Sequence, residues 1–308
     1  MTTDTQYLKE RLILAWVAVL IASAFPELIL GFRYQLEIFQ WLSITKAALL
    51  VLVLLLTALV RRLRPLRALV TMLLTIHVAT GTFGAFVSLS AWKQGIGSIE
   101  SPFIRAMIDV QFVRVAVTLA ALSVLFVLYR TPKRFYLAPG VMDAKASRVA
   151  WLGISGASSW LRVGTVLVVV LSVGTLSFLS LAMRQALSAL SHVLPMLPFV
   201  LLFSTTNALG EEITYRLALL APVGGVVTSG HAMMMSAVYF GVAHYSGIPS
   251  GAIGVVMAGF LGWLACRSVL DTKGVVWAFG MHFVQDIWIF WFMAAIFSLQ
   301  VHPGKIAQ

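Results

Sequence analysis

The chain has 308 residues, of which 60% are hydrophobic and 11% are charged. Because about a quarter of the residues of an ordinary soluble domain are charged, this composition excludes a soluble globular protein and indicates that lipid is the main solvent. The net charge of +11 does not indicate nucleic-acid binding, since the basic residues gather in short clusters between apolar segments, as membrane topology requires.

Apolar segments long enough to cross about 30 Å of hydrocarbon recur along the chain. One segment, residues 231–246, is short for a full crossing, so we expect eight or nine spans. The predicted fold class is all-α: a polytopic transmembrane helix bundle with an intramembrane polar cavity. In chain order, the predicted helices lie near residues 12–32, 38–60, 68–91, 108–129, 163–183, 194–221, 231–246, 251–269 and 275–298.

Two clusters of basic residues determine the predicted orientation. They follow the second and the fourth predicted spans, and cytoplasmic loops carry an excess of Lys and Arg. We therefore expect an integral membrane protein, in the cell membrane if the source is bacterial, with a cytoplasmic N-terminus. The C-terminus would lie outside with nine spans and inside with eight. The clusters are Arg61, Arg62, Arg64 and Arg67, and Arg130, Lys133, Arg134, Lys145 and Arg148.

The longest polar stretch, residues 130–161, separates two regions of different character, and we expect an amphipathic surface helix in it. Residues 1–161 would form N-terminal transmembrane helices and this cytoplasmic loop. In that region, Asp109 and Arg114 are expected to form an interfacial pair. Residues 162–308 would form a C-terminal catalytic helical core. The one cysteine, Cys266, lies in an apolar segment, which excludes an intrachain disulfide.

A pair of glutamates interrupts the apolar segment between Pro198 and Pro222. Charged side chains at membrane depth are costly, so each one is a candidate functional residue. Glu212 and Arg216 lie four residues apart on one helix face and can form an ion pair. Glu211 points about 100° away from Glu212. It has no cation nearby in the sequence, so it would be free to act as a general base. The alternative is a structural ion-pair network.

Two further segments place histidines at membrane depth. His244 ends a short apolar helix, and Phe240 lies one turn before it on the same face. His282 and Asp286 are four residues apart, so they can bond each other or point together at a reacting carbonyl. Each motif alone also fits a structural role, as a packing histidine or a His–Asp bond. Three helices with polar groups at compatible depths favour one shared cavity.

The order and spacing of these motifs resemble those of the CPBP family of intramembrane metalloproteases. This family includes the Ras-converting CAAX endopeptidase of prenylated proteins and the bacterial abortive-infection relatives. The match extends over residues 211–286, and the first 160 residues carry no part of it. The motifs are Glu211-Glu212-x-x-x-Arg216, which is the most specific, Phe240-x-x-x-His244 and His282-x-x-x-Asp286.

The resemblance implies a role for each residue. Glu211 and His244 would activate a water molecule for attack on a peptide carbonyl, and His282 and Asp286 would stabilise the oxyanion. The best-known members carry asparagine where Asp286 stands. Because an ionised aspartate cannot donate to an oxyanion, we expect Asp286 to orient His282 instead. The residues implied to support the site are Glu212, Arg216 and Phe240.

The expected function is that of an intramembrane CAAX-type endopeptidase. Its substrate would be a membrane-associated peptide or protein, CAAX-like or prenylated, or a small peptide, and its other partner would be membrane lipid. The alternatives are a non-proteolytic scaffold, immunity or transport-regulating protein of the same fold, and a proton or ion transporter.

The resemblance also bears on whether the protein binds a metal ion. The family name implies one, and Glu211, His244 and His282 are the residues that could hold Zn²⁺. Because the chain has no H-E-x-x-H motif, we expect no obligatory metal.

Overall fold

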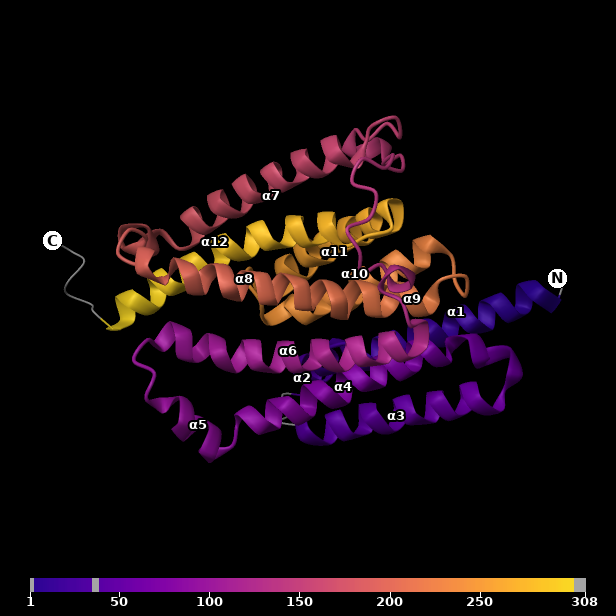
Figure 1. The fold of residues 1–308 in the computed structure, drawn as a ribbon. Helices are drawn as coiled ribbons and strands as arrows, with labels where there is room; N and C mark the ends of the chain where they lie inside the picture. The colour runs from indigo at the N-terminus through magenta and orange to yellow at the C-terminus, as the bar shows by residue number, and fades with distance from the viewer. Residues whose placement is uncertain (1–2, 35–38, 302–308) are drawn as a thin grey trace.

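The computed structural model describes residues 3–34 and 39–301. Within these ranges the chain is an all-α bundle without β-strands, as predicted. The long helices run side by side, with α8 between α6 and α12, and with α3 and α4 on the opposite side of this layer from α7 (Figure 1). The helices are α1 (Thr3–Ala22), α2 (Phe25–Tyr34), α3 (Phe39–Leu59), α4 (Arg67–Val87), α5 (Ser90–Gly97), α6 (Pro102–Tyr129), α7 (Trp160–Ala182), α8 (Leu197–Glu212), α9 (Ala218–Val223), α10 (Ser229–Ala243), α11 (Gly251–Thr272) and α12 (Val276–Val301).

Six of the described helices are long and apolar enough to cross a membrane, and a seventh span results if the bent pair α1–α2 is counted as one. These helices fit an integral membrane protein, but the prediction of eight or nine spans is too high. The predicted segment 231–246 forms α10, whose 15 residues are fewer than the roughly 20 that a span needs. The predicted segment 194–221 is divided into α8, a π-helical turn at Ile213–Leu217 and α9. The six helices are α3, α4, α6, α7, α11 and α12.

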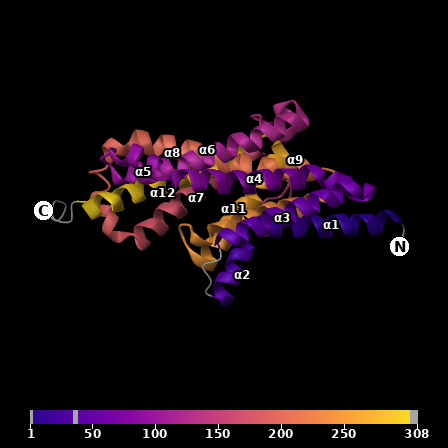
Figure 2. The same ribbon diagram turned by 90° about the horizontal axis from the view of Figure 1, so that it is seen from below.

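The predicted first span, residues 12–32, is broken into two helices that are bent by 61° at the break (Figure 2). Pro26, the second residue of α2, explains the break, because proline has no backbone N–H to donate and its ring clashes with the preceding turn. The break leaves the backbone carbonyl of Ser23 free to accept a hydrogen bond from Lys46 on α3, at 2.8 Å.

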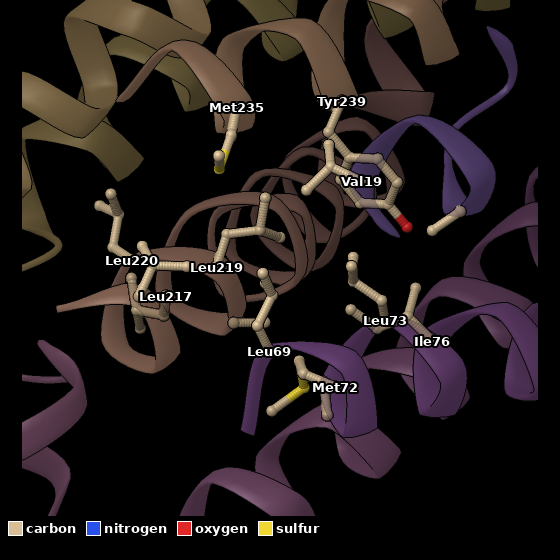
Figure 3. Close-up of a cluster of buried hydrophobic side chains, with 14 of the residues drawn as sticks. Val19, Leu69, Met72, Leu73, Ile76, Leu217, Leu219, Leu220, Met235 and Tyr239 are labelled. Carbon is tan, nitrogen blue, oxygen red and sulfur yellow. The ribbon is translucent and has the colours of Figure 1, made fainter. Parts of the chain in front are cut away.

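One hydrophobic core joins the N-terminal helices to the C-terminal region. Side chains of α4 pack against the segment that follows α8 and against α10, and α1 contributes to the same core (Figure 3). In a bilayer, close packing of this kind stabilises helix association, because lipid tails are as apolar as the side chains. The labelled residues of the core are Val19, Leu69, Met72, Leu73, Ile76, Leu217, Leu219, Leu220, Met235 and Tyr239.

Residues 130–159 form a structured loop that contains only short 3₁₀ turns, so the prediction of an amphipathic helix is wrong. Three glycines in this loop have positive φ angles, which a helix does not allow; they are Gly140, Gly153 and Gly156. The loop is anchored by Asp271 at the end of α11. The Asp271 carboxylate accepts hydrogen bonds from the Ser147 backbone N–H at 2.8 Å, the Ser147 hydroxyl at 2.6 Å and the Trp160 indole N–H at 3.0 Å.

The same loop crosses the turn between α11 and α12 at a pair of glycines. A Cβ atom added to Gly274 would lie 2.5 Å from the Cα atom of Gly140, so no larger residue fits there without movement of the backbone. Next to this crossing, the backbone N–H of Val141 donates to the carbonyl oxygen of Thr272 at 2.7 Å. The loop therefore docks beside the start of α12, the helix that carries His282.

The anchoring of the loop can be tested by replacing Asp271. Asp271→Ala removes the acceptor of three hydrogen bonds, and we expect it to lower the free energy of unfolding by about 2 kcal/mol. The measurement is the midpoint of thermal unfolding in detergent. Asp143→Ala, at an exposed position of the same loop, should melt like the wild type. Equal midpoints for the two variants would contradict the anchoring role.

Candidate active site

Three helices bring the predicted site residues together. Glu211 and Glu212 end α8, His244 directly follows α10, and His282 and Asp286 lie on α12. Because α8 lies beside both α6 and α12 (Figure 1), side chains of α6 can also reach this cluster.

Glu211 lies at the centre of the cluster and is 5% exposed. Its Oε1 atom is 3.0 Å from Nη2 of Arg114 on α6. Its Oε2 atom is 3.4 Å from Nε2 of His282 and 4.0 Å from Nε2 of His244. The expectation that Glu211 has no cation near it is therefore wrong. Oε2 nevertheless has no hydrogen-bond donor among the described residues, so it is the oxygen that can take up a proton.

Glu212 and Arg216 form the predicted ion pair inside the protein. Nε of Arg216 is 3.2 Å from Oε2 of Glu212, and neither side chain is exposed. Arg216 lies in a π-helical turn, Ile213–Leu217, a distortion that is common at functional sites. Its guanidinium carbon lies 3.8 Å from the centre of the Phe240 ring, which is a cation–π contact.

Glu212 also determines the orientation of the His282 ring. Nδ1 of His282 donates to Oε1 of Glu212 at 2.9 Å, which turns Nε2 toward Glu211 and Asp286. We expected Asp286 to orient His282, but its Oδ1 atom is 3.7 Å from Nε2, too far for a hydrogen bond. The other oxygen, Oδ2, accepts a hydrogen bond from the amide of Asn207 on α8 at 2.8 Å. Asp286 is thus bonded to α8.

His244 faces the cluster from the end of α10. Its Nδ1 atom is 2.9 Å from the backbone carbonyl oxygen of Phe240, so Nδ1 carries a proton and Nε2 of the neutral ring is left to accept one. The His244 ring lies 4.2 Å from the Phe240 ring, which also contacts His282 edge-on at 5.7 Å. The side chain of His244 is 27% exposed, against 5% for His282, which makes it the more accessible histidine.

These side chains line a cavity of about 450 Å³ between the helices from α6 to α12. Most other lining side chains are apolar, and a few convergent polar groups in an apolar cavity are typical of a binding or active site. The cavity-lining polar residues are Arg114, Thr175, Asn207, Glu211, His244, Ser246, His282, Gln285 and Asp286.

The comparison with known families covers this cluster. Residues 193–288 match the family model described as type II CAAX prenyl endopeptidase Rce1-like. The match supports membership of the CAAX family of intramembrane proteases, and the matched range includes every residue singled out from the resemblance. It covers less than a third of the chain. No curated protein and no solved structure gives a significant match.

Two polar residues of the cluster, Arg114 and Asn207, were not predicted to belong to the site. Arg114 lies outside the matched range and was expected to pair with Asp109, but Asp109 pairs with Lys93. Arg114 lies within the apolar helix α6 and pairs with Glu211 on α8. No spacing within α6 could indicate a partner on another helix. Asn207 lies one turn before Glu211 in an apolar segment. A polar side chain at this depth could have marked it as a candidate site residue.

The three residues that could hold a metal, Glu211, His244 and His282, do not form a metal-binding group. Within the described ranges, no set of three His, Cys, Asp or Glu side chains has a suitable arrangement. The guanidinium of Arg114 next to Glu211 also disfavours a second cation there. Because the residues fit a metal poorly, the mechanism proposed below uses none.

The buried pair Glu212–Arg216 can be tested by a double-mutant comparison. Arg216→Met leaves the Glu212 carboxylate buried without its cation, so we expect it to lower the free energy of unfolding by about 3–5 kcal/mol. The double variant Glu212→Gln/Arg216→Met should recover part of this loss. The measurement is thermal unfolding in detergent, and a double variant no more stable than the single one would contradict the pairing.

Proposed function

We propose that the chain is an intramembrane endopeptidase in which Glu211, assisted by His244, activates a water molecule for attack on a peptide bond. The observation that carries this proposal is the position of Glu211 Oε2. This atom has no hydrogen-bond donor among the described residues, and it lies 4.0 Å from Nε2 of His244 beside the cavity. One water molecule can bridge two atoms at this separation, so the general base is within reach of its substrate.

In the proposed reaction, the water gives one proton to Glu211 while its oxygen attacks the carbonyl carbon of the peptide. Nε2 of His244 accepts a hydrogen bond from the same water, because Nδ1–H is held by the carbonyl of Phe240. The tetrahedral intermediate then breaks its C–N bond, and Glu211 returns the proton to the leaving nitrogen. The immediate products are a carboxylic acid and an amine, and transfer of the second water proton from the acid to the amine gives a carboxylate and an ammonium group.

We assign the stabilisation of the oxyanion to His282 and Asn207. His282 uses Nδ1–H for Glu212, so its Nε2 can donate only when the ring is an imidazolium. Three neighbouring carboxylates balance that charge. Asn207 uses one amide hydrogen for Asp286 and has a second one to donate. Asp286 is then a positioning residue, and it need not donate to the oxyanion itself.

The cavity supports a membrane-associated peptide as the substrate. Next to the polar cluster it is lined by apolar side chains of α7, α11 and α12, including Leu171, Phe178, Leu261 and Phe290. Such walls can hold an apolar anchor beside the peptide bond. The proposed substrates are therefore CAAX-like or prenylated chains, with small unanchored peptides as poorer ones.

We also propose that the N-terminus is cytoplasmic. The first basic cluster lies beside the start of α1, because Glu10 forms an ion pair with Arg62 at 3.0 Å. The second cluster follows α6 at the same end of the bundle (Figure 1). The two clusters therefore lie on one side of the membrane, which is the arrangement that the positive-inside rule requires.

One observation favours the alternative of a non-proteolytic scaffold, immunity or transport-regulating protein. The ion pair between Arg114 and Glu211 gives Glu211 a structural partner. If this pair served stability alone, substitution of Glu211 would lower stability and no peptide would be cleaved.

The two functions are separated by the variant Glu211→Gln, which keeps the shape of the side chain but cannot take up the proton. We expect cleavage to fall by about 10²- to 10⁴-fold, the usual contribution of a general base. The measurement is mass spectrometry of matched prenylated and unprenylated C-terminal peptides incubated with the purified protein.

The matched control is Glu100→Gln, at an exposed position between α5 and α6, which should cleave like the wild type. Cleavage that survives Glu211→Gln would sink the proposed mechanism. An inactive wild type together with a large fall in the unfolding midpoint of Glu211→Gln would favour the structural role.

Metal dependence is tested by chelation. Because the proposed base and oxyanion donors are protein side chains, prolonged treatment with a chelator should change the cleavage rate by less than about twofold. The rate is measured with the same peptides before and after removal of the chelator. A loss of activity that added Zn²⁺ restores would overturn the metal-free mechanism.

A further inference from the structure

A second cavity, of about 490 Å³, lies on the other side of the layer formed by α6 and α8. Its walls come from α3, α4 and α6, from the break between α1 and α2, and from the end of α8, the π-helical turn and α10, whereas the first cavity extends toward α7, α11 and α12. Glu211 and Arg114 line both cavities. Their ion pair is therefore part of the partition between the two.

The second cavity contains its own ion pair. Lys46 on α3 is 4% exposed, and it bonds the carbonyl of Ser23 and the Oε1 atom of Glu27. The other carboxylate oxygen of Glu27, Oε2, is buried and has no hydrogen-bond partner among the described residues. A buried carboxylate oxygen without a donor is costly, so a ligand that can donate a hydrogen bond should occupy the space beside it.

The charges in the walls indicate which ligand fits. Two cations, Lys46 and Arg114, face two carboxylates, Glu27 and Glu211. The imidazole of His77 also lines the cavity, where its Nε2 atom is 2.9 Å from the backbone carbonyl oxygen of Ser43. The walls are close to neutral, which does not favour a charged ligand. Ion pairs and an orphan carboxylate oxygen also do not favour an acyl chain. These polar groups lie among apolar side chains, and a roomy cavity with several hydrogen-bonding partners holds water. A volume of about 490 Å³ has room for several water molecules.

We propose that the second cavity is a hydrated chamber that supplies water to Glu211 from the side opposite the peptide. Hydrolysis consumes one water molecule for each bond cleaved, and a peptide with an apolar anchor would fill the first cavity and block that route. A chamber bounded by the ion pair Arg114–Glu211 provides a separate route to the general base. The supply role depends on the proposed peptidase function, whereas the hydration of the chamber does not.

Hydration is tested by the reactivity of an introduced cysteine. Cys266 is the only cysteine of the chain and is fully buried, so Cys266→Ala provides a cysteine-free background. In this background we place Ser43→Cys in the chamber wall and, as the control, Val170→Cys on the outer face of α7, where Val170 is 59% exposed. The protein is reconstituted in lipid nanodiscs and treated with a small, cationic, water-soluble methanethiosulfonate.

Ser43→Cys should react at least about tenfold faster than Val170→Cys, because thiolates form in water and not in hydrocarbon. Equal, slow rates would mean that lipid tails fill the cavity and would overturn the proposal. This comparison needs no peptidase activity, so a failure of the proposed function leaves its result intact.

The supply role is tested on the same variant with the peptides used above. Unmodified Ser43→Cys should cleave like the wild type, and attachment of a bulky group to Cys at position 43 should lower kcat about tenfold with KM unchanged, because the peptide binds in the other cavity. A modified protein with an unchanged kcat would overturn the supply role. A raised KM would show that the peptide enters this cavity and would overturn it as well.

Discussion

The buried carboxylate of Glu212 is the interaction on which the rest of the site depends. An isolated charge at membrane depth is costly, and this one is neutralised by Arg216 on one side and bonded to His282 on the other. The two contacts tie the π-helical turn after α8 to the last helix. Because Glu211 immediately precedes Glu212 on the same helix, the direction in which it faces is set by these contacts.

Local spacing carried most of what the sequence could reveal about the candidate site. The pair Glu212–Arg216 follows from an interval of four residues, and so does the shared face of His282 and Asp286. What no interval could show is contact between distant helices. The arginine on Glu211 comes from α6, and the bond that orients His282 comes from α8.

Hydropathy predicted the all-α membrane bundle but overcounted its spans, for a physical reason. An apolar run indicates burial in lipid or in protein, and it does not show where the backbone departs from α-helix. The run at 194–221 contains a π-helical turn, and the run at 12–32 bends at a proline. Asp286 shows the same limit for side chains: its i,i+4 spacing favours His282, but its hydrogen bond goes to Asn207.

The docking of the long loop onto the turn between α11 and α12 makes the loop part of the packed structure. It closes against Gly274 and Asp271, and the core behind it joins α1 and α4 to α9 and α10. The two regions of the chain are therefore held together by packing and hydrogen bonds as well as by the peptide linkage. A break in the backbone near Gly156, in the exposed part of the loop, would leave these contacts in place.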